Sequence, residues 1–73
     1  MSKPHAKLRG AMMANDIDYA YLANKLLRGT VYISQRMMGK QPWTLDECYQ
    51  ILDMLHIPYE MLPEYFPPKG RPA

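Results

Sequence analysis

Residues 44–55 contain the clearest helix signal in the chain. Thr44 is followed three residues later by Glu47, the spacing of a capping box, in which each side chain bonds the other residue's backbone N–H at the start of a helix. Apolar residues then recur at helical spacing, which places them on one helix face. We expect this face to point into the core, and its members are Leu45, Cys48, Tyr49, Leu52 and Leu55.

A first helix is predicted over about residues 5–14, near the start of the chain. Leu8, Ala11 and Met12 lie on one of its faces and are expected to point inward. Asn15 suits the end of this helix, because Asn tolerates the left-handed conformation that often follows a last turn.

A second helix is predicted to begin at Asp18, whose carboxylate can accept the free backbone N–H groups of a first turn. Ile17 before this cap and Leu22 within the helix match a hydrophobic staple. Gly29 is expected to end the second helix. The inward face of this helix is predicted to consist of Leu22, Ala23 and Leu26.

A third helix is predicted to start at about Thr30, with Gly29 or Thr30 as its cap, and to end at Gly39. Ile33 and Met37 are four residues apart in it, so they share a narrow apolar face. This face is expected to pack on the second helix.

The length of 73 residues allows one domain. Pro58 stops the helix that starts after Thr44, and a short fifth helix is predicted over residues 59–65. Val, Ile and Thr are too sparse for a set of strands, and no segment alternates polar and apolar residues for long. We therefore predict an all-α fold, a compact domain of four to five helices over residues 1–66, with a flexible tail over residues 67–73.

The net charge of +2 conceals an uneven distribution along the chain. Residues 19–45 carry four basic side chains and no acidic one, whereas residues 46–64 carry five acidic side chains and no Lys or Arg. Such asymmetry favours a partner with many negative charges against the basic part. Two ordinary solvated faces would give the same distribution, so charge alone leaves both interpretations open.

Several protein classes are disfavoured by the sequence. No apolar run is long enough for a transmembrane helix, and no secretory signal precedes the first helix. Cys48 is the single cysteine, and with two scattered His residues it makes a poor zinc site, so we expect a buried, unreactive thiol and a cytoplasmic protein. No nucleophile has a neighbouring base and no glycine-rich loop is present, so we expect neither an enzyme nor a cofactor site.

The segment from the second to the third helix has the pattern of a helix-turn-helix motif. Small hydroxyl and amide side chains on the third helix are poor core formers but good partners for base edges in a major groove. We predict base contacts by Thr30, Val31, Ser34, Gln35 and Met38, although Ser34 and Gln35 also suit ordinary surface positions. We predict phosphate contacts by Lys25, Arg28, Arg36 and Lys40, which solvated charges would equally explain.

Ile17 through Lys40 resembles the helix-turn-helix of the lambda repressor/Cro-like (XRE) family of bacterial and phage regulators. Leu22-Ala23-Asn24-Lys25-Leu26 is similar to the Leu-Ala-x-Lys-Leu segment of that family. Tyr32 through Lys40 is similar to its recognition helix, which is closed by Gly-Lys. Trp43 through Glu47 resembles the start of the next helix, and Leu55 through Pro58 resembles the end before a fifth helix. The resemblance covers roughly residues 7–63.

The resemblance implies a five-helix fold and sequence-specific binding of double-stranded DNA, as a phage or prophage regulator. It extends the predicted phosphate contacts to Tyr19, Tyr32 and Gln41. Leu27 replaces the glycine that is usual in the turn, so we expect the turn to be shifted or remodelled.

Arg36 also departs from the family pattern, because its position is often aliphatic. We expect Met37 to take over the packing at this point of the third helix. Arg36 would then be free to reach a phosphate.

We predict a Cro-like transcriptional repressor that acts as a homodimer on a palindromic operator and blocks polymerase by occupying it. The C-terminal segment has more apolar residues than a short helix can bury, so we expect it to form the dimer surface. The residues concerned are Ile57, Tyr59, Met61, Leu62, Tyr65 and Phe66. A protein-interaction adaptor or antirepressor with the same fold is the alternative, favoured by the low net charge and by Met38 on the reading face.

Overall fold

The computed structural model of the chain describes residues 5–67. Within this range the backbone forms five α-helices, one 3₁₀ turn and no strand, which confirms the predicted all-α fold. The elements are α1 (Ala6–Ala14), α2 (Tyr19–Leu26), α3 (Thr30–Met37), α4 (Leu45–Met54), η1 (Tyr59–Met61) and α5 (Leu62–Tyr65). Most of the predicted tail, residues 68–73, lies outside the described residues.

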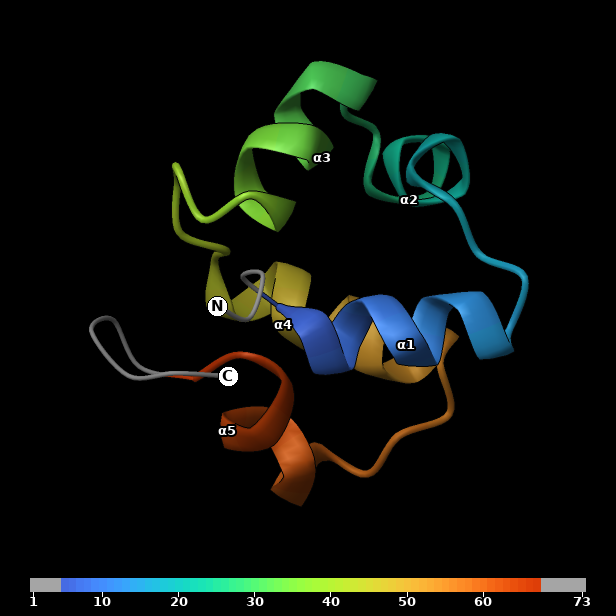
Figure 1. The fold of residues 1–73 in the computed structure, drawn as a ribbon, viewed down its shortest axis with the longest axis vertical. Helices are drawn as coiled ribbons and strands as arrows, with labels where there is room; N and C mark the ends of the chain where they lie inside the picture. Colours follow the sequence, from blue (N-terminus) through green and yellow to red (C-terminus); the bar gives the residue numbers. More distant parts are fainter. Residues whose placement is uncertain (1–4, 68–73) are drawn as a thin grey trace.

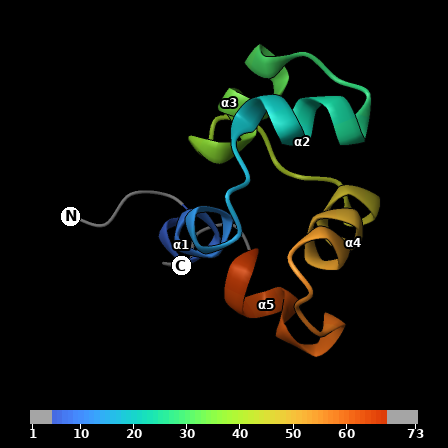
Figure 2. The ribbon, with the colours of Figure 1, turned by 90° about the vertical axis from the view of Figure 1, so that its right-hand side faces the viewer.

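The α2–α3 pair occupies one end of the molecule, and η1 with α5 occupies the other end (Figures 1 and 2). α1 and α4 lie between these ends, and both contact α5. α2 packs extensively on α3 and also touches α4. Within residues 5–67 every helix is too short or too polar to span a bilayer.

One core collects apolar side chains from α1 to α4 and from Phe66, the residue that follows α5. The inward faces predicted for the first three helices are confirmed, with Ala11 only partly buried. Burial of these side chains supplies the main driving force for a helical domain of this size. The buried members are Leu8, Met12, Ile17, Leu22, Ala23, Leu26, Ile33, Met37, Cys48, Ile51, Leu52, Leu55 and Phe66.

The inward face of α4 differs from the predicted one. Leu45 is 60% exposed and Tyr49 is half-buried, whereas Ile51, absent from the predicted face, is fully buried. The predicted and the observed faces both have helical spacing, so periodicity could not choose between them. The contacts of α4 with α2 and α5 decide which face turns inward. The buried apolar residues of α4 and its cap are Cys48, Ile51, Leu52 and Leu55.

The predicted side-chain caps of α2 and α4 are both formed. The backbone N–H of Tyr21 donates to Asp18 Oδ1 at 2.8 Å. At the start of α4 the backbone N–H of Thr44 donates to Glu47 Oε1 at 2.9 Å, and the N–H of Glu47 donates to Thr44 Oγ1 at 3.2 Å. The second pair is the complete capping box that the spacing predicts.

Helices α1 to α4 all end in a Schellman motif, in which a left-handed residue follows the last turn. At the end of α2 the N–H of Arg28 donates to the carbonyl of Ala23 at 2.8 Å, and the N–H of Leu27 to that of Asn24 at 3.3 Å. Equivalent pairs of bonds close the other three helices. The left-handed residues are Asp16, Leu27, Gly39 and His56.

Three expectations about these ends are corrected. Asp16, and not Asn15, adopts the left-handed conformation after α1, because the buried Ile17 must bond back to that helix. Gly29 does not end α2, which ends at Leu26; of the two caps predicted for α3, Gly29 is the one observed, with an extended φ of −80°. The turn at Leu27 is not remodelled, since leucine adopts the glycine-type φ of 58° with its side chain 89% exposed.

We expect Leu27→Gly to raise the free energy of unfolding by about 1 kcal/mol. A non-glycine residue in the left-handed conformation is strained by roughly 1–2 kcal/mol, part of which is offset because glycine has more freedom in the unfolded chain. The exposed leucine side chain loses little burial on removal. Urea denaturation followed by circular dichroism measures the change.

Gly39→Ala is the matched control, because Gly39 holds the same place after α3 with φ 78°. This variant should be less stable than the parent by about 1 kcal/mol. A loss of stability in Leu27→Gly would contradict the strain argument.

Candidate nucleic-acid interface

The outward face of α3 carries the side chains predicted to contact bases. Thr30, Val31, Gln35 and Met38 are exposed, and Ser34 is half-buried. Ser34 Oγ lies 3.6 Å from Met38 Sδ, to which it donates a weak hydrogen bond. The face is oriented by the opposite side of the helix, where Ile33 and Met37 are fully buried.

Exposed polar and basic side chains lie at both ends of this face. Lys25 is in the last turn of α2 and Arg28 is in the connection to α3. Lys40 and Gln41 follow the end of α3, and all four side chains are exposed. The fold therefore gathers most of the predicted phosphate contacts around one helix.

The Tyr32 ring contacts Arg36, the remaining basic residue of α3, and also Arg28 in the connection before this helix. The guanidinium carbon of Arg36 lies 3.4 Å from the centre of the Tyr32 ring, and that of Arg28 lies 4.9 Å from it. Such cation–π contacts are attractive because the ring face is electron-rich. Arg36 Nη1 also donates to the backbone carbonyl of Tyr32 at 3.5 Å.

Met37 takes over the packing, as expected. Arg36 was expected to extend freely toward a phosphate, but it does not. Its side chain is half-buried on Tyr32, and within residues 5–67 its buried Nε has no hydrogen-bond partner. An arginine is accommodated at this half-buried position because its flat guanidinium stacks on an aromatic ring. The phosphate contact of Arg36 stays a prediction.

Glu47 is a buried acid at the junction of α3 and α4. Its carboxylate accepts a hydrogen bond from the Tyr32 hydroxyl as well as the capping bond from the Thr44 backbone N–H. Burial opposes the charged form, but the bonds from Tyr32 and Thr44, with a smaller contribution from Arg36, hold the pKa of Glu47 below its ordinary value. The capping spacing identified this residue as a cap, but nothing local indicated its burial or its bond to Tyr32.

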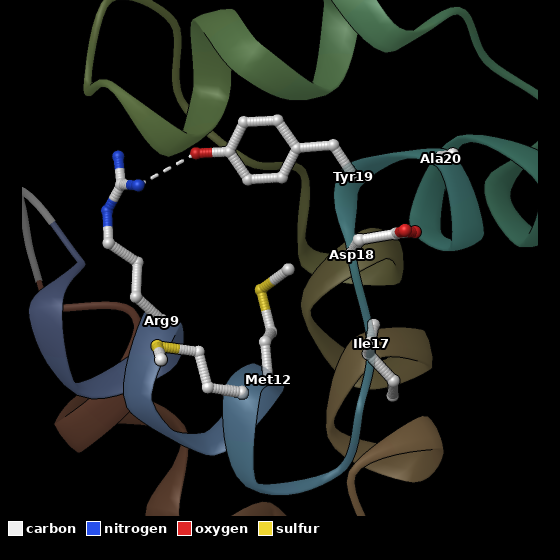
Figure 3. Close-up of a pocket in the computed structure, with 7 residues that line it drawn as sticks. Arg9, Met12, Ile17, Asp18, Tyr19 and Ala20 are labelled. Carbon is white, nitrogen blue, oxygen red and sulfur yellow. Dashed lines mark hydrogen bonds between the residues drawn. The ribbon is translucent and has the colours of Figure 1, made fainter.

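Arg9 is a further positioning residue that the sequence did not indicate. Its Nη1 donates to the Tyr19 hydroxyl at 2.8 Å, and its Nη2 donates to the backbone carbonyl of Met37 at 3.3 Å. Figure 3 shows the side chain reaching from α1 toward Tyr19 at the start of α2. A cation at the C-terminal carbonyls of α3 also complements the helix dipole. Tyr19, predicted to contact phosphate, is half-buried and already holds this bond.

A hollow of about 660 Å³ opens beside the Arg9–Tyr19 bond, between α1 and the start of α2 (Figure 3). Its lining is mostly apolar, with Arg9 and Asp18 as its charged groups. The lining residues are Arg9, Met12, Met13, Ile17, Asp18, Tyr19 and Ala20.

The residues predicted to form a dimer surface pack largely against their own chain. Phe66 is buried in the core, and only Tyr59, at 51%, is exposed. The Tyr59 ring packs against Tyr49 in a tilted arrangement, with ring centres 4.7 Å apart and ring planes at 53°. Its hydroxyl donates to the carboxylate of Asp53 at 2.7 Å. The half-buried members are Ile57, Met61, Leu62 and Tyr65. The C-terminal segment therefore leaves less apolar surface unburied than the sequence led us to expect.

The predicted burial of Cys48 is confirmed. Burial, followed by the nearby charge of Glu47, raises the pKa of the Cys48 thiol to about 11. Among residues 5–67, no three His, Cys, Asp or Glu side chains are close enough together to hold a metal ion.

The chain matches no protein-family model, and neither its sequence nor its fold finds a match among the curated proteins and solved structures compared with it.

We expect Tyr32→Phe to lower the free energy of unfolding at neutral pH by about 1.5–3 kcal/mol, the usual contribution of a hydrogen bond to a charged group. Because folding lowers the pKa of Glu47, its stabilising contribution is present above the unfolded pKa and is lost as pH falls through the folded pKa. The difference between Tyr32→Phe and the parent should therefore shrink in acid. Urea denaturation at about pH 7 and pH 3 measures it.

Tyr21→Phe controls for the loss of a tyrosine hydroxyl, because Tyr21 is exposed. It should leave stability unchanged at both pH values. Equal stability of the parent and Tyr32→Phe at neutral pH would rule out the structural role of the Tyr32–Glu47 bond.

Proposed function

We propose that this protein is a sequence-specific, double-stranded DNA-binding transcriptional regulator that reads its operator with α3. One observation carries the proposal: the outward face of α3 presents exposed polar side chains, and exposed cations lie at both of its ends. A major groove admits a helix, and phosphates line both of its edges. The resemblance of residues 17–40 to the helix-turn-helix of XRE-type regulators supports the same function.

In this proposal α3 lies in the major groove, where Thr30 and Gln35 offer donors and acceptors to base edges. Lys25, Arg28 and Lys40 contact the flanking phosphates, which fix the register of the helix. Tyr32 holds the guanidinium groups of Arg28 and Arg36 near the same phosphate backbone of the DNA. Occupation of the operator excludes polymerase and represses transcription.

We further propose that two copies bind an inverted repeat. An eight-residue helix reaches few base pairs, so a single copy has little specificity. Two α3 helices in successive major grooves, about 34 Å apart, would double the site that is read.

Selection of bound duplexes from a random pool, followed by affinity measurements across salt concentrations, tests the proposal. We expect an enriched inverted repeat and an affinity that falls with salt, by a log–log slope of about −0.9 for each phosphate neutralised. Lys40→Ala should reduce the magnitude of this slope by about 0.9.

Lys7→Ala is the matched control for the loss of one positive charge. Lys7 of α1 pairs at 3.7 Å with Glu64 of α5, and α5 lies at the end of the molecule opposite α3 (Figure 2). The variant should keep the parent slope. If the two variants had the same slope, Lys40 would not contact a phosphate.

The alternative function, a protein-interaction adaptor or antirepressor, is favoured by apolar exposure on the α2–α3 end. Leu27 is 89% exposed, Val31 is 70% exposed and Met38 is 49% exposed. If no DNA sequence is enriched and the affinity for DNA does not change with salt concentration, a protein partner is favoured over DNA.

The number of copies bound can be measured by sedimentation. Because the C-terminal segment packs within its own chain, we expect a monomer at micromolar concentration and a complex of two chains on the selected duplex. Tyr59→Asp changes the most exposed member of the predicted dimer surface and should weaken the binding of the second copy more than that of the first. A complex of one chain on an inverted repeat would contradict the dimeric arrangement.

A further inference from the structure

Val31 is an apolar side chain that the fold leaves in solvent. It is 70% exposed in the first turn of α3, although Ile33 and Met37 of the same helix are fully buried. Gln35 is also exposed and follows Val31 by four residues, so the two side chains are neighbours on one face. The outward face of α3 therefore places the two methyl groups of Val31 beside the side-chain amide of Gln35.

The surroundings of this pair favour DNA over a protein as its partner. The exposed side chains of Arg28 and Lys40 lie before and after α3 on the chain. Between Arg36 and the start of α4 no acidic residue is present to offset them. An apolar side chain flanked by cations suits the thymine methyl group, an apolar feature of a groove bordered by phosphates.

The spacing of the two side chains limits which bases they can reach together. Four residues of helix rise by about 6 Å, and stacked bases rise by about 3.4 Å, so the pair spans no more than about two base steps. The amide of Gln35 matches the donor and acceptor that adenine presents in the major groove, and the methyl groups of Val31 match the 5-methyl of thymine.

We infer that each operator half-site contains an adenine facing Gln35 and, within two base pairs of it, a thymine whose methyl group contacts Val31. The inference rests on the proposed binding of DNA by α3 and specifies the A·T base pairs that α3 reads.

Replacement of single thymines by deoxyuridine in the selected duplex tests the Val31 contact, because the exchange removes only the 5-methyl group. At one position of each half-site we expect the affinity of the parent to fall about fourfold, the effect of one buried methyl group. Val31→Ala should bind the thymine duplex more weakly than the parent does. It should show no further loss with deoxyuridine at that position.

Leu27→Ala is the matched control, because Leu27 is an exposed apolar residue that precedes α3. It should retain the full effect of deoxyuridine. Circular dichroism establishes that each variant has the parent's helix content, so that misfolding is not read as lost contact.

Substitution of 7-deazaadenine for adenine tests the Gln35 contact. We expect a loss of about tenfold at one adenine within two base pairs of the sensitive thymine, and no further loss in Gln35→Ala. If the parent binds the selected duplex with a steep salt dependence but no thymine is sensitive to deoxyuridine, the inference is wrong and the proposed DNA binding stands. If no duplex is enriched, the proposed function fails and the inference fails with it.

Discussion

The buried carboxylate of Glu47 joins α3 to the rest of the molecule. It completes the cap of α4 and accepts a hydrogen bond from the Tyr32 hydroxyl, so the start of one helix anchors the middle of another. The charge is tolerated in the interior because hydrogen bonds satisfy it. Tyr32 in turn carries the guanidinium groups of Arg28 and Arg36 on its ring.

A second tether acts on the other side of α3. Arg9 reaches from α1 to Tyr19 and to the last carbonyl of α3, while Ile33 and Met37 fill the core beneath the helix. Polar tethers at its side and end, with apolar contacts below, fix the direction of the outward face. Such preorganisation is what a helix needs to present a defined set of side chains to a groove.

Much of the fold could be predicted because the relevant signals are local. Asp18, Thr44 and Glu47 cap their helices as their spacing predicted, and the apolar spacing of the first three helices identified their inward faces. The prediction failed where two local solutions were equally good. On α4 the faces containing Leu45 and Ile51 both obey helical periodicity, and the left-handed role assigned to Asn15 belongs to Asp16.

The candidate site divides in the same way. The sequence by itself determined which side chains lie outward on α3. Ile33 and Met37 form the single apolar face of this helix, and the helical period of about 3.6 residues places Val31 and Gln35 on the opposite face. Only the tertiary structure decided that Glu47 is buried under Tyr32, that Arg36 stacks, and that Arg9 reaches a carbonyl 28 residues away. These interactions join segments distant in the chain, and their geometry exists only after α1, α3 and α4 have packed around one core.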